Sequence, residues 1–153
     1  MNKILLSSNR DDWETPQDLF DALHRVFGFV FDVCANDSNK KCDGFFSKST
    51  NALTSEWKDS PCWMNPPYGR NIGNWVKKAY ESSINHRTTV VCLLPARTDT
   101  RWWHDFCTKG EIFYLKGRLK FSESKNSATF PSAIVVFRPS VKYALDGKFD
   151  FFN

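Results

Sequence analysis

Apolar residues recur along this chain with two periods, one typical of helices and one typical of buried strands. Residues 16–27 carry an apolar side chain every three or four positions and are followed by Gly28, a pattern that predicts an amphipathic helix ending at a glycine. Residues 88–94 form an almost wholly apolar run, which is typical of a central parallel strand. The same criteria predict strands over residues 29–33, 44–46, 62–64, 111–116 and 133–138, and helices over residues 75–84 and 100–107.

The order of these elements predicts an α/β fold. Strands alternate with helices through most of the chain, so we expect a compact Rossmann-like layer with a mostly parallel sheet. The last two strands have no helix between them and should form an antiparallel hairpin at one edge. At the start of the first helix, Thr15 is predicted as the N-cap and Pro16 as the first helical residue, because each residue type favours that position.

Composition narrows the class of protein without giving its function. The 153 residues suit a single domain over residues 1–153, with the polar residues 1–12 loosely held. No segment is apolar enough to cross a bilayer, and Met1-Asn2-Lys3 is followed by only three apolar residues, so we expect no signal peptide and a cytoplasmic location. The net charge of +4 permits a polyanionic partner but does not require one.

The five cysteines indicate neither a disulfide framework nor a zinc site. They are odd in number, irregularly spaced and without a CxxC pair. We therefore expect free, buried thiols and no bound metal. Cys92 lies inside an apolar run, where a thiol behaves as a small hydrophobic side chain.

The tetrapeptide Asn65-Pro66-Pro67-Tyr68 directly follows the predicted strand 62–64. Ligands in open α/β sheets bind beyond the carboxyl ends of strands, so a site is expected here. The two prolines stiffen the backbone and hold the Asn65 side-chain oxygen and the Pro66 carbonyl as neighbouring acceptors. Two such acceptors suit an aromatic NH₂ group, because they stabilise the positive charge that grows on nitrogen as it attacks a methyl group. Tyr68 offers a face on which a planar base can stack.

Other short motifs accompany this tetrapeptide in a fixed order. They are Thr15-Pro16, Phe31-Asp32-Val33-Cys34-Ala35, Asn51-Ala52-Leu53, Trp57, Trp75, Leu93-Leu94-Pro95-Ala96, Trp102-Trp103, Gly117-Arg118-Leu119-Lys120-Phe121 and Ser132-Ala133-Ile134-Val135-Val136-Phe137. With Asn65-Pro66-Pro67-Tyr68, this order resembles the phage-encoded DNA N6-adenine methyltransferases (Dam-like) over roughly residues 13–138. The resemblance implies an S-adenosylmethionine-dependent methyltransferase fold, and an enzyme that methylates the exocyclic amine of a flipped adenine in DNA. The four residues of the tetrapeptide would be catalytic.

The resemblance also implies a pocket for S-adenosylmethionine. Thr15 and Pro16 would line its methionine end, and Asp32 would face the amino group or the sulfonium of the methionine part. The glycine-rich turn that usually follows the first strand of such enzymes is absent here. Cys34 and Ala35 replace it, and their small side chains still allow close approach to the backbone.

The adenine end of this pocket is assigned by the same resemblance. Asn51 begins a segment similar to the one that meets the cofactor's adenine, and Phe46 is a stacking neighbour in this hypothesis. The acid that would bind the ribose hydroxyls stays unassigned, with Asp43 as a candidate. The predicted cofactor-binding residues are Thr15, Pro16, Asp32, Cys34, Ala35, Phe46, Asn51 and Asn65.

DNA would be held by cations in the loops that follow strands, since Lys and Arg side chains supply phosphate contacts. The chain has no room for a separate recognition domain, so these loops would read a short site, alone as a monomer or with a second subunit as a homodimer. A stacking partner opposite Tyr68 is expected from Phe121 or Phe130. The predicted DNA-contacting residues are Arg70, Arg97, Arg101, Arg118, Lys120 and Phe121.

Three alternatives remain open at this stage. A protein glutamine methyltransferase would use the same tetrapeptide, because a planar primary amide asks for the same two acceptors. A DNA-binding relative without catalytic activity is the second, although Asn65 and Tyr68 are both intact. Methylation of cytosine N4 is the third, since the tetrapeptide recognises an amine more than a ring. If the chain is phage- or prophage-encoded, it would act in the cytoplasm of the bacterial host.

Overall fold

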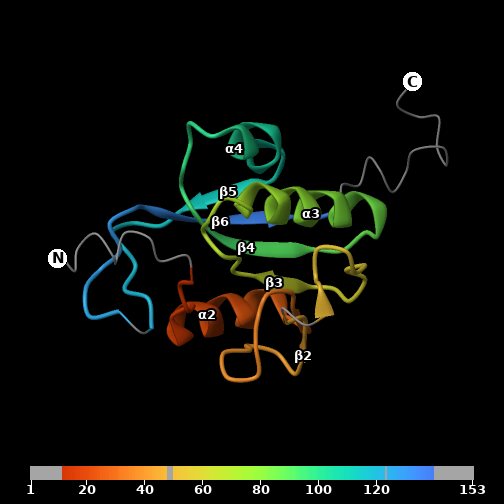
Figure 1. The fold of residues 1–153 in the computed structure, drawn as a ribbon, viewed down its shortest axis with the longest axis horizontal. Helices are drawn as coiled ribbons and strands as arrows, with labels where there is room; N and C mark the ends of the chain where they lie inside the picture. Colours follow the sequence, from red (N-terminus) through yellow and green to blue (C-terminus); the bar gives the residue numbers. More distant parts are fainter. Residues whose placement is uncertain (1–11, 48–49, 123, 140–153) are drawn as a thin grey trace.

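A computed structural model describes residues 12–47, 50–122 and 124–139 of the chain. Their strands form one six-stranded sheet in the order β2-β1-β3-β4-β6-β5, with helices packed against it (Figure 1). The predicted α/β class is therefore confirmed. The elements are α2 (Gln17–Phe27), β1 (Phe31–Asp32), β2 (Gly44–Phe45), β3 (Cys62–Met64), α3 (Ile72–Asn85), β4 (Val90–Pro95), α4 (Arg101–Asp105), the 3₁₀-helix η2 (Cys107–Lys109), β5 (Glu111–Tyr114) and β6 (Ser132–Phe137).

The sheet is parallel from β2 to β4 and antiparallel from β4 to β5. Strand β1 pairs in parallel with β2 and β3, and β3 pairs in parallel with β4. Strand β6 runs antiparallel to both β4 and β5, which confirms the predicted hairpin at the edge. Because Pro95 lies opposite Ser132, the loop between β5 and β6 reaches the carboxyl end of β4. This loop therefore lies at the same end of the strands as the segment that follows β3, the end that is called the carboxyl edge of the sheet below.

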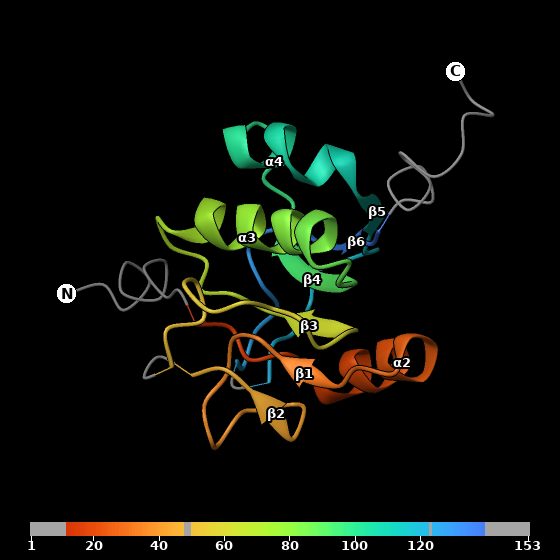
Figure 2. The same cartoon turned by 90° about the vertical axis from the view of Figure 1, so that its right-hand side faces the viewer.

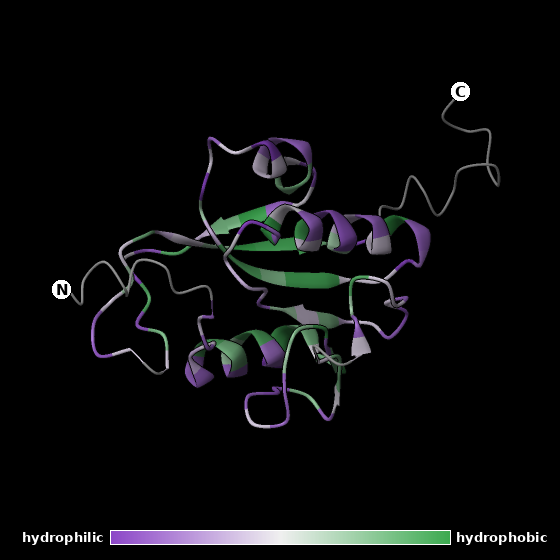
Figure 3. Cartoon of the chain, in the orientation of Figure 1, coloured by the Kyte–Doolittle hydropathy of each residue, from purple (hydrophilic) through white to green (hydrophobic). Residues whose placement is uncertain are grey.

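The core is centred on β4 and β6, in which every residue is buried. Figure 3 shows these strands in the hydrophobic colours and the outer faces of the helices in the hydrophilic ones. Helix α3 lies beside β4, with α4 beyond it, whereas α2 lies next to β1 and β3 (Figure 2). Aromatic contacts join α2 to the sheet, since the Phe20 ring packs 5.6 Å from the Trp63 ring.

The predicted start of the first helix is wrong. Helix α2 begins at Gln17, Pro16 occupies the N-cap position, and no side chain caps the helix. The buried Thr15 hydroxyl instead accepts a hydrogen bond from the side-chain amide of Asn65. The predicted end is confirmed, because Gly28 adopts the left-handed conformation with φ 66° and its N–H donates to the His24 carbonyl.

The boundaries of other elements differ from the predicted ones for local reasons. Helix α3 begins at Ile72 rather than at residue 75, because Ile72 is buried and adds an apolar position to the packed face. The predicted helix 100–107 divides into α4 and η2, with the Thr100 hydroxyl capping α4 by accepting from the Trp103 N–H. Strand 62–64 matches its prediction. The strands predicted over 29–33, 44–46, 88–94, 111–116 and 133–138 are shorter or shifted by one or two residues in the structure.

All five cysteines are free thiols. Cys62, Cys92 and Cys107 are buried, as predicted, whereas Cys34 and Cys42 are only half-buried. Burial raises the pKa of Cys62 and of Cys107 to about 12, so both thiols stay protonated and unreactive at neutral pH. Among the residues described, no helix is both long and apolar enough to pass through a lipid bilayer.

Candidate active site

A cleft of about 710 Å³ opens at the carboxyl ends of β1 and β3. Its walls come from residues 12–15, the turn after β1, residues 46–47 and 51–53 after β2, the end of β3 with the residues that follow it, and Trp75 of α3. The volume lies within the range of ordinary small-molecule sites. Every residue predicted to bind the cofactor lines this cleft except Pro16; those that do are Thr15, Asp32, Cys34, Ala35, Phe46, Asn51 and Asn65.

The side-chain amide of Asn65 has a fixed orientation. Its nitrogen donates to the backbone carbonyl of Trp13 and, at 2.9 Å, to the hydroxyl of Thr15. A carbonyl oxygen only accepts hydrogen bonds, so the atom facing Trp13 has to be the NH₂ group. The Asn65 Oδ1 atom is buried and finds no hydrogen-bond partner among the described residues. A buried acceptor without a partner is costly, so this oxygen is suited to a donor supplied by a ligand.

Asp32 is the buried acid of the cleft, with 3% of its surface exposed. Its carboxylate accepts from the backbone N–H groups of Cys34 at 3.2 Å and Lys41 at 3.1 Å, and so shapes the turn that forms the cleft wall. Burial raises the pKa of Asp32 from 3.8 to about 6, although these two N–H groups and the charge of Lys41 act in the opposite direction. The group therefore titrates close to neutral pH.

Tyr68 lies beside the cleft but does not line it. Only 3% of its surface is exposed, and its hydroxyl donates to the Leu93 carbonyl at 3.1 Å. The rings of Phe121 and Phe130 stand edge-on to the Tyr68 ring at 6.2 and 5.8 Å. Trp13 completes this aromatic cluster, with its ring 5.2 Å from Phe121 and 5.3 Å from Phe130. The face predicted for base stacking is thus enclosed by aromatic rings in this conformation.

The adenine end of the predicted pocket is formed by less regular backbone. Asn51 adopts a positive φ of 50°, and Phe46 packs against Phe31 with ring centroids 4.6 Å apart. Asp43, the candidate for binding the ribose, is exposed and does not line the cleft. Sequence reasoning missed Trp13 and Glu14, which also line the cleft. An aromatic residue two positions before Thr15 in a polar segment was the available signal for Trp13.

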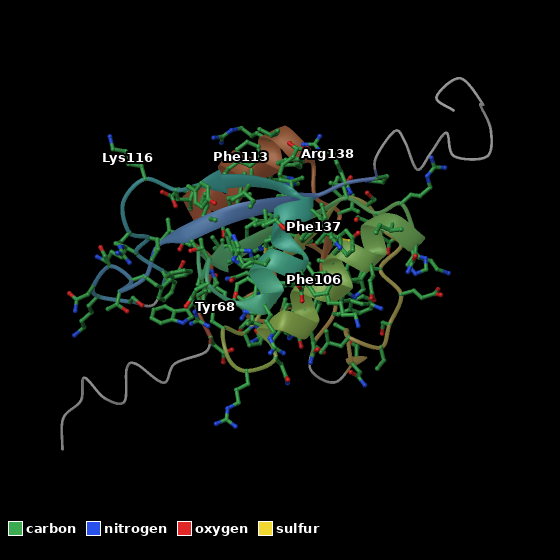
Figure 4. The ribbon with its side chains drawn as sticks, turned by 90° about the horizontal axis from the view of Figure 1, so that it is seen from above. Tyr68, Phe106, Phe113, Lys116, Phe137 and Arg138 are labelled. Atoms are coloured by element: carbon green, nitrogen blue, oxygen red, sulfur yellow. The ribbon has the colours of Figure 1, made fainter. Side chains whose placement is uncertain are left out.

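The predicted DNA-contacting cations are all exposed. Arg97 follows β4, and its guanidinium donates to the backbone carbonyl of Tyr68 at 3.3 Å, which ties the tetrapeptide to the next loop. Arg118 and Lys120 lie in the loop between β5 and β6. Figure 4 shows Tyr68 and Lys116 toward one end of the sheet and Arg138 toward the other. Phe121 differs from the cations, because only 1% of its surface is exposed and it belongs to the core.

The sequence of the chain is similar to a known protein family and to two phage proteins. Residues 3–144 match the family described as "DNA N-6-adenine-methyltransferase (Dam)". The chain belongs to this family. It is 34% identical over 146 residues to the DNA N-6-adenine-methyltransferase of Haemophilus phage HP1 (strain HP1c1), an alignment that covers 89% of this chain and 83% of the phage protein. It is 38% identical over 141 residues to the DNA N-6-adenine-methyltransferase of Escherichia phage T1, covering 90% of this chain and 58% of that protein. The resemblance inferred from the ordered motifs is therefore confirmed.

Proposed function

We propose that this chain transfers a methyl group from S-adenosylmethionine to the exocyclic amine of adenine in DNA. Membership of the Dam family supports the substrate and the reaction. The observation that carries the proposal is the Oδ1 atom of Asn65, which has no partner in the part of the chain that the structure describes and lies at a cleft of about 710 Å³ at the carboxyl end of β3. An amide oxygen in that position can accept a hydrogen bond from an NH₂ group.

The tetrapeptide acts on the target amine. An aromatic amine is a weak nucleophile, since its lone pair is delocalised into the ring. Hydrogen bonds from its two N–H groups to Asn65 Oδ1 and the Pro66 carbonyl favour the pyramidal form and stabilise the charge that develops on nitrogen. The methylated amine can then lose its extra proton to water, so no side chain needs to act as a base.

The residues of the cleft hold the cofactor in this proposal. S-adenosylmethionine supplies an electrophilic methyl group when bound. Asp32, the one buried carboxylate among the described residues, suits the ammonium group of the methionine part. Cys34 and Ala35 line the same wall with small side chains, and Phe46 and Asn51 line the wall formed after β2. Phe46 lies beside Asp32 in the sheet, because its N–H donates to the Asp32 carbonyl at 2.9 Å.

Access of the base requires a movement of the enclosing rings. An adenine inside a duplex is stacked and paired, so it has to be extruded before its amine can reach Asn65. Phe130 comes from the loop between β5 and β6 and stands 5.8 Å from the Tyr68 ring. Displacement of this loop would expose Tyr68 as a stacking surface. Cations near the same edge, including Arg97 and Arg118, would hold the phosphates.

The family favours DNA over the protein glutamine alternative, because both phage relatives are named for adenine in DNA. The phage origin of these relatives also supports action in the cytoplasm of a bacterial host. Since loops would contact the bases, we expect a short target site.

Mass spectrometry of the methylated product tests the proposal. The protein is incubated with isotopically labelled S-adenosylmethionine and unmethylated duplex DNA, and the DNA is then digested to nucleosides. We expect labelled N6-methyladenosine in its deoxy form. Labelled N4-methylcytosine would overturn the choice of base, label in a protein substrate instead of DNA would favour the glutamine alternative, and no transfer at all would favour an inactive DNA-binding relative.

Asn65→Ala provides the matched variant for this experiment. Removal of the acceptor should lower kcat by at least about 10²-fold, because one preorganised contact to the developing charge is lost. Binding of DNA should stay close to wild type, as measured by fluorescence anisotropy. An Asn65→Ala enzyme with wild-type kcat would exclude Asn65 from the catalytic step.

A further inference from the structure

The Asn65 amide is held by two hydrogen bonds to another segment of the chain. Both hydrogens of its NH₂ group are directed at residues 13–15, a segment fifty residues earlier in the chain. One goes to a main-chain carbonyl, that of Trp13, and the other goes to a side chain, the hydroxyl of Thr15. The orientation of the acceptor therefore depends on a residue that does not belong to the tetrapeptide.

We propose that Thr15 is a positioning residue, whose hydroxyl holds the Asn65 amide in the orientation that the Trp13 carbonyl sets, with Oδ1 facing the target amine. This inference rests on the proposed function. If the Asn65 amide turned by 180°, its NH₂ group would face the NH₂ group of the target, and its oxygen would face the Trp13 carbonyl. Two donors would then oppose each other on one side and two acceptors on the other. The Thr15 hydroxyl and the Trp13 carbonyl together hold the catalytically useful orientation before the substrate arrives.

The position of Thr15 is itself fixed by the loop between β5 and β6. The Ser122 hydroxyl donates to the Thr15 carbonyl at 3.0 Å, and the Ser122 N–H donates to the Glu14 carbonyl at 3.1 Å. Thr15 is also buried, with 3% of its surface exposed. A side chain on such a supported segment can hold another side chain with little loss of entropy at the moment of reaction.

This role differs from the cofactor contact that the family resemblance assigns to Thr15. A cofactor contact acts on the affinity for S-adenosylmethionine. A positioning contact acts on kcat, because the orientation of Asn65 matters when charge develops on the amine. The two roles are therefore separable by measuring binding and turnover in the same variants.

The test compares Thr15→Val, Thr15→Ser and Thr88→Val in the full chain. Valine removes the hydroxyl while keeping the shape, and serine keeps the hydroxyl. Thr88 is the control, because it is also a buried threonine whose hydroxyl is hydrogen-bonded, donating to the Trp57 carbonyl at 2.6 Å, but it does not line the cleft. For each variant we would measure kcat on duplex DNA, Kd for S-adenosylhomocysteine and Tm.

We expect kcat to fall about tenfold in Thr15→Val, with Kd for S-adenosylhomocysteine within about twofold of wild type, as loss of one hydrogen bond would give. Thr15→Ser should restore kcat to within about twofold. Thr88→Val should keep the wild-type kcat even where its Tm falls. If Thr15→Val fails to fold, Thr15→Ala is measured in its place with the same expectations.

Three results would overturn the inference. They are an unchanged kcat with a raised Kd in Thr15→Val, a loss of kcat that serine does not restore, and an equal loss of kcat in Thr88→Val. Failure of the proposed function looks different, because the wild type itself would then transfer no methyl group to adenine. In that case the inference falls with the function on which it rests.

Discussion

At the residue scale, the buried Asp32 opposes the stability of the fold at neutral pH. Its pKa in the folded chain, about 6, lies above the unfolded value of 3.8, because burial disfavours the carboxylate. The folded state therefore binds the proton more tightly, and stability decreases as the pH rises from about 4 to about 6. A group that lowers stability at neutral pH while lining a cleft is a candidate for ligand binding.

Cofactor binding should accordingly depend on the ionisation of Asp32. If its carboxylate holds the ammonium group of the cofactor, protonation removes the attraction, and affinity should fall as the pH drops below about 6. We expect S-adenosylhomocysteine to bind about tenfold more weakly at pH 5 than at pH 7.5, as measured by calorimetry. Asp32→Asn should bind weakly at both values. Equal affinity of the wild type at the two pH values would contradict this contact.

At the scale of the element, the helices begin and end for different reasons. Helix α2 ends at a glycine in the left-handed conformation, a local device that the sequence displays directly. Its start carries no side-chain cap, because Pro16 occupies the N-cap position and has no side-chain acceptor, while the Thr15 hydroxyl accepts from Asn65 in another part of the chain. The end of this helix was therefore predictable from its own residues, whereas the start depended on a tertiary contact.

Gly28→Ala should lower the free energy of unfolding by about 1 kcal/mol. The cause is the positive φ of 66°, since a Cβ atom at this position would meet no atom within 4 Å. Gly28→Asn is the matched variant, because asparagine tolerates the left-handed conformation better than alanine, and it should lose less. Urea denaturation measures both. A wild-type unfolding free energy for Gly28→Ala would show that the conformation at residue 28 carries no such cost.

At the scale of the whole molecule, the sheet brings the proposed chemistry and the proposed DNA contacts to one edge. The carboxyl ends of the parallel strands position Asn65, and the register between β4 and β6 brings the loop that carries Arg118 and Lys120 to the same edge. The opposite edge holds other cations, among them Arg87 before β4 and Lys109 before β5. Arg87 and Lys109 therefore serve as a control for Arg118 and Lys120, since they carry the same charge at the other end of the strands.

The double variant Arg118→Ala, Lys120→Ala should weaken DNA binding. The logarithm of its binding constant should also fall less steeply with the logarithm of salt concentration, by about 2 in slope, because two phosphate contacts would be lost. The double variant Arg87→Ala, Lys109→Ala removes the same charge from the other edge and should leave the slope unchanged. Fluorescence anisotropy over a series of salt concentrations gives both slopes. Equal decreases in the two variants would mean that net charge, and not this loop, governs binding.

The sequence by itself determined which segments become helices and strands, the α/β class and the position of the tetrapeptide proposed to be catalytic. These features depend on periodicity and on short-range stereochemistry, as at Gly28 and at the prolines after Asn65. Only the tertiary structure decided that the Thr15 hydroxyl supports Asn65 and that Phe121 and Phe130 enclose Tyr68. Those contacts join residues tens of positions apart, and the packing of the sheet and its loops, which no local pattern encodes, brings them together.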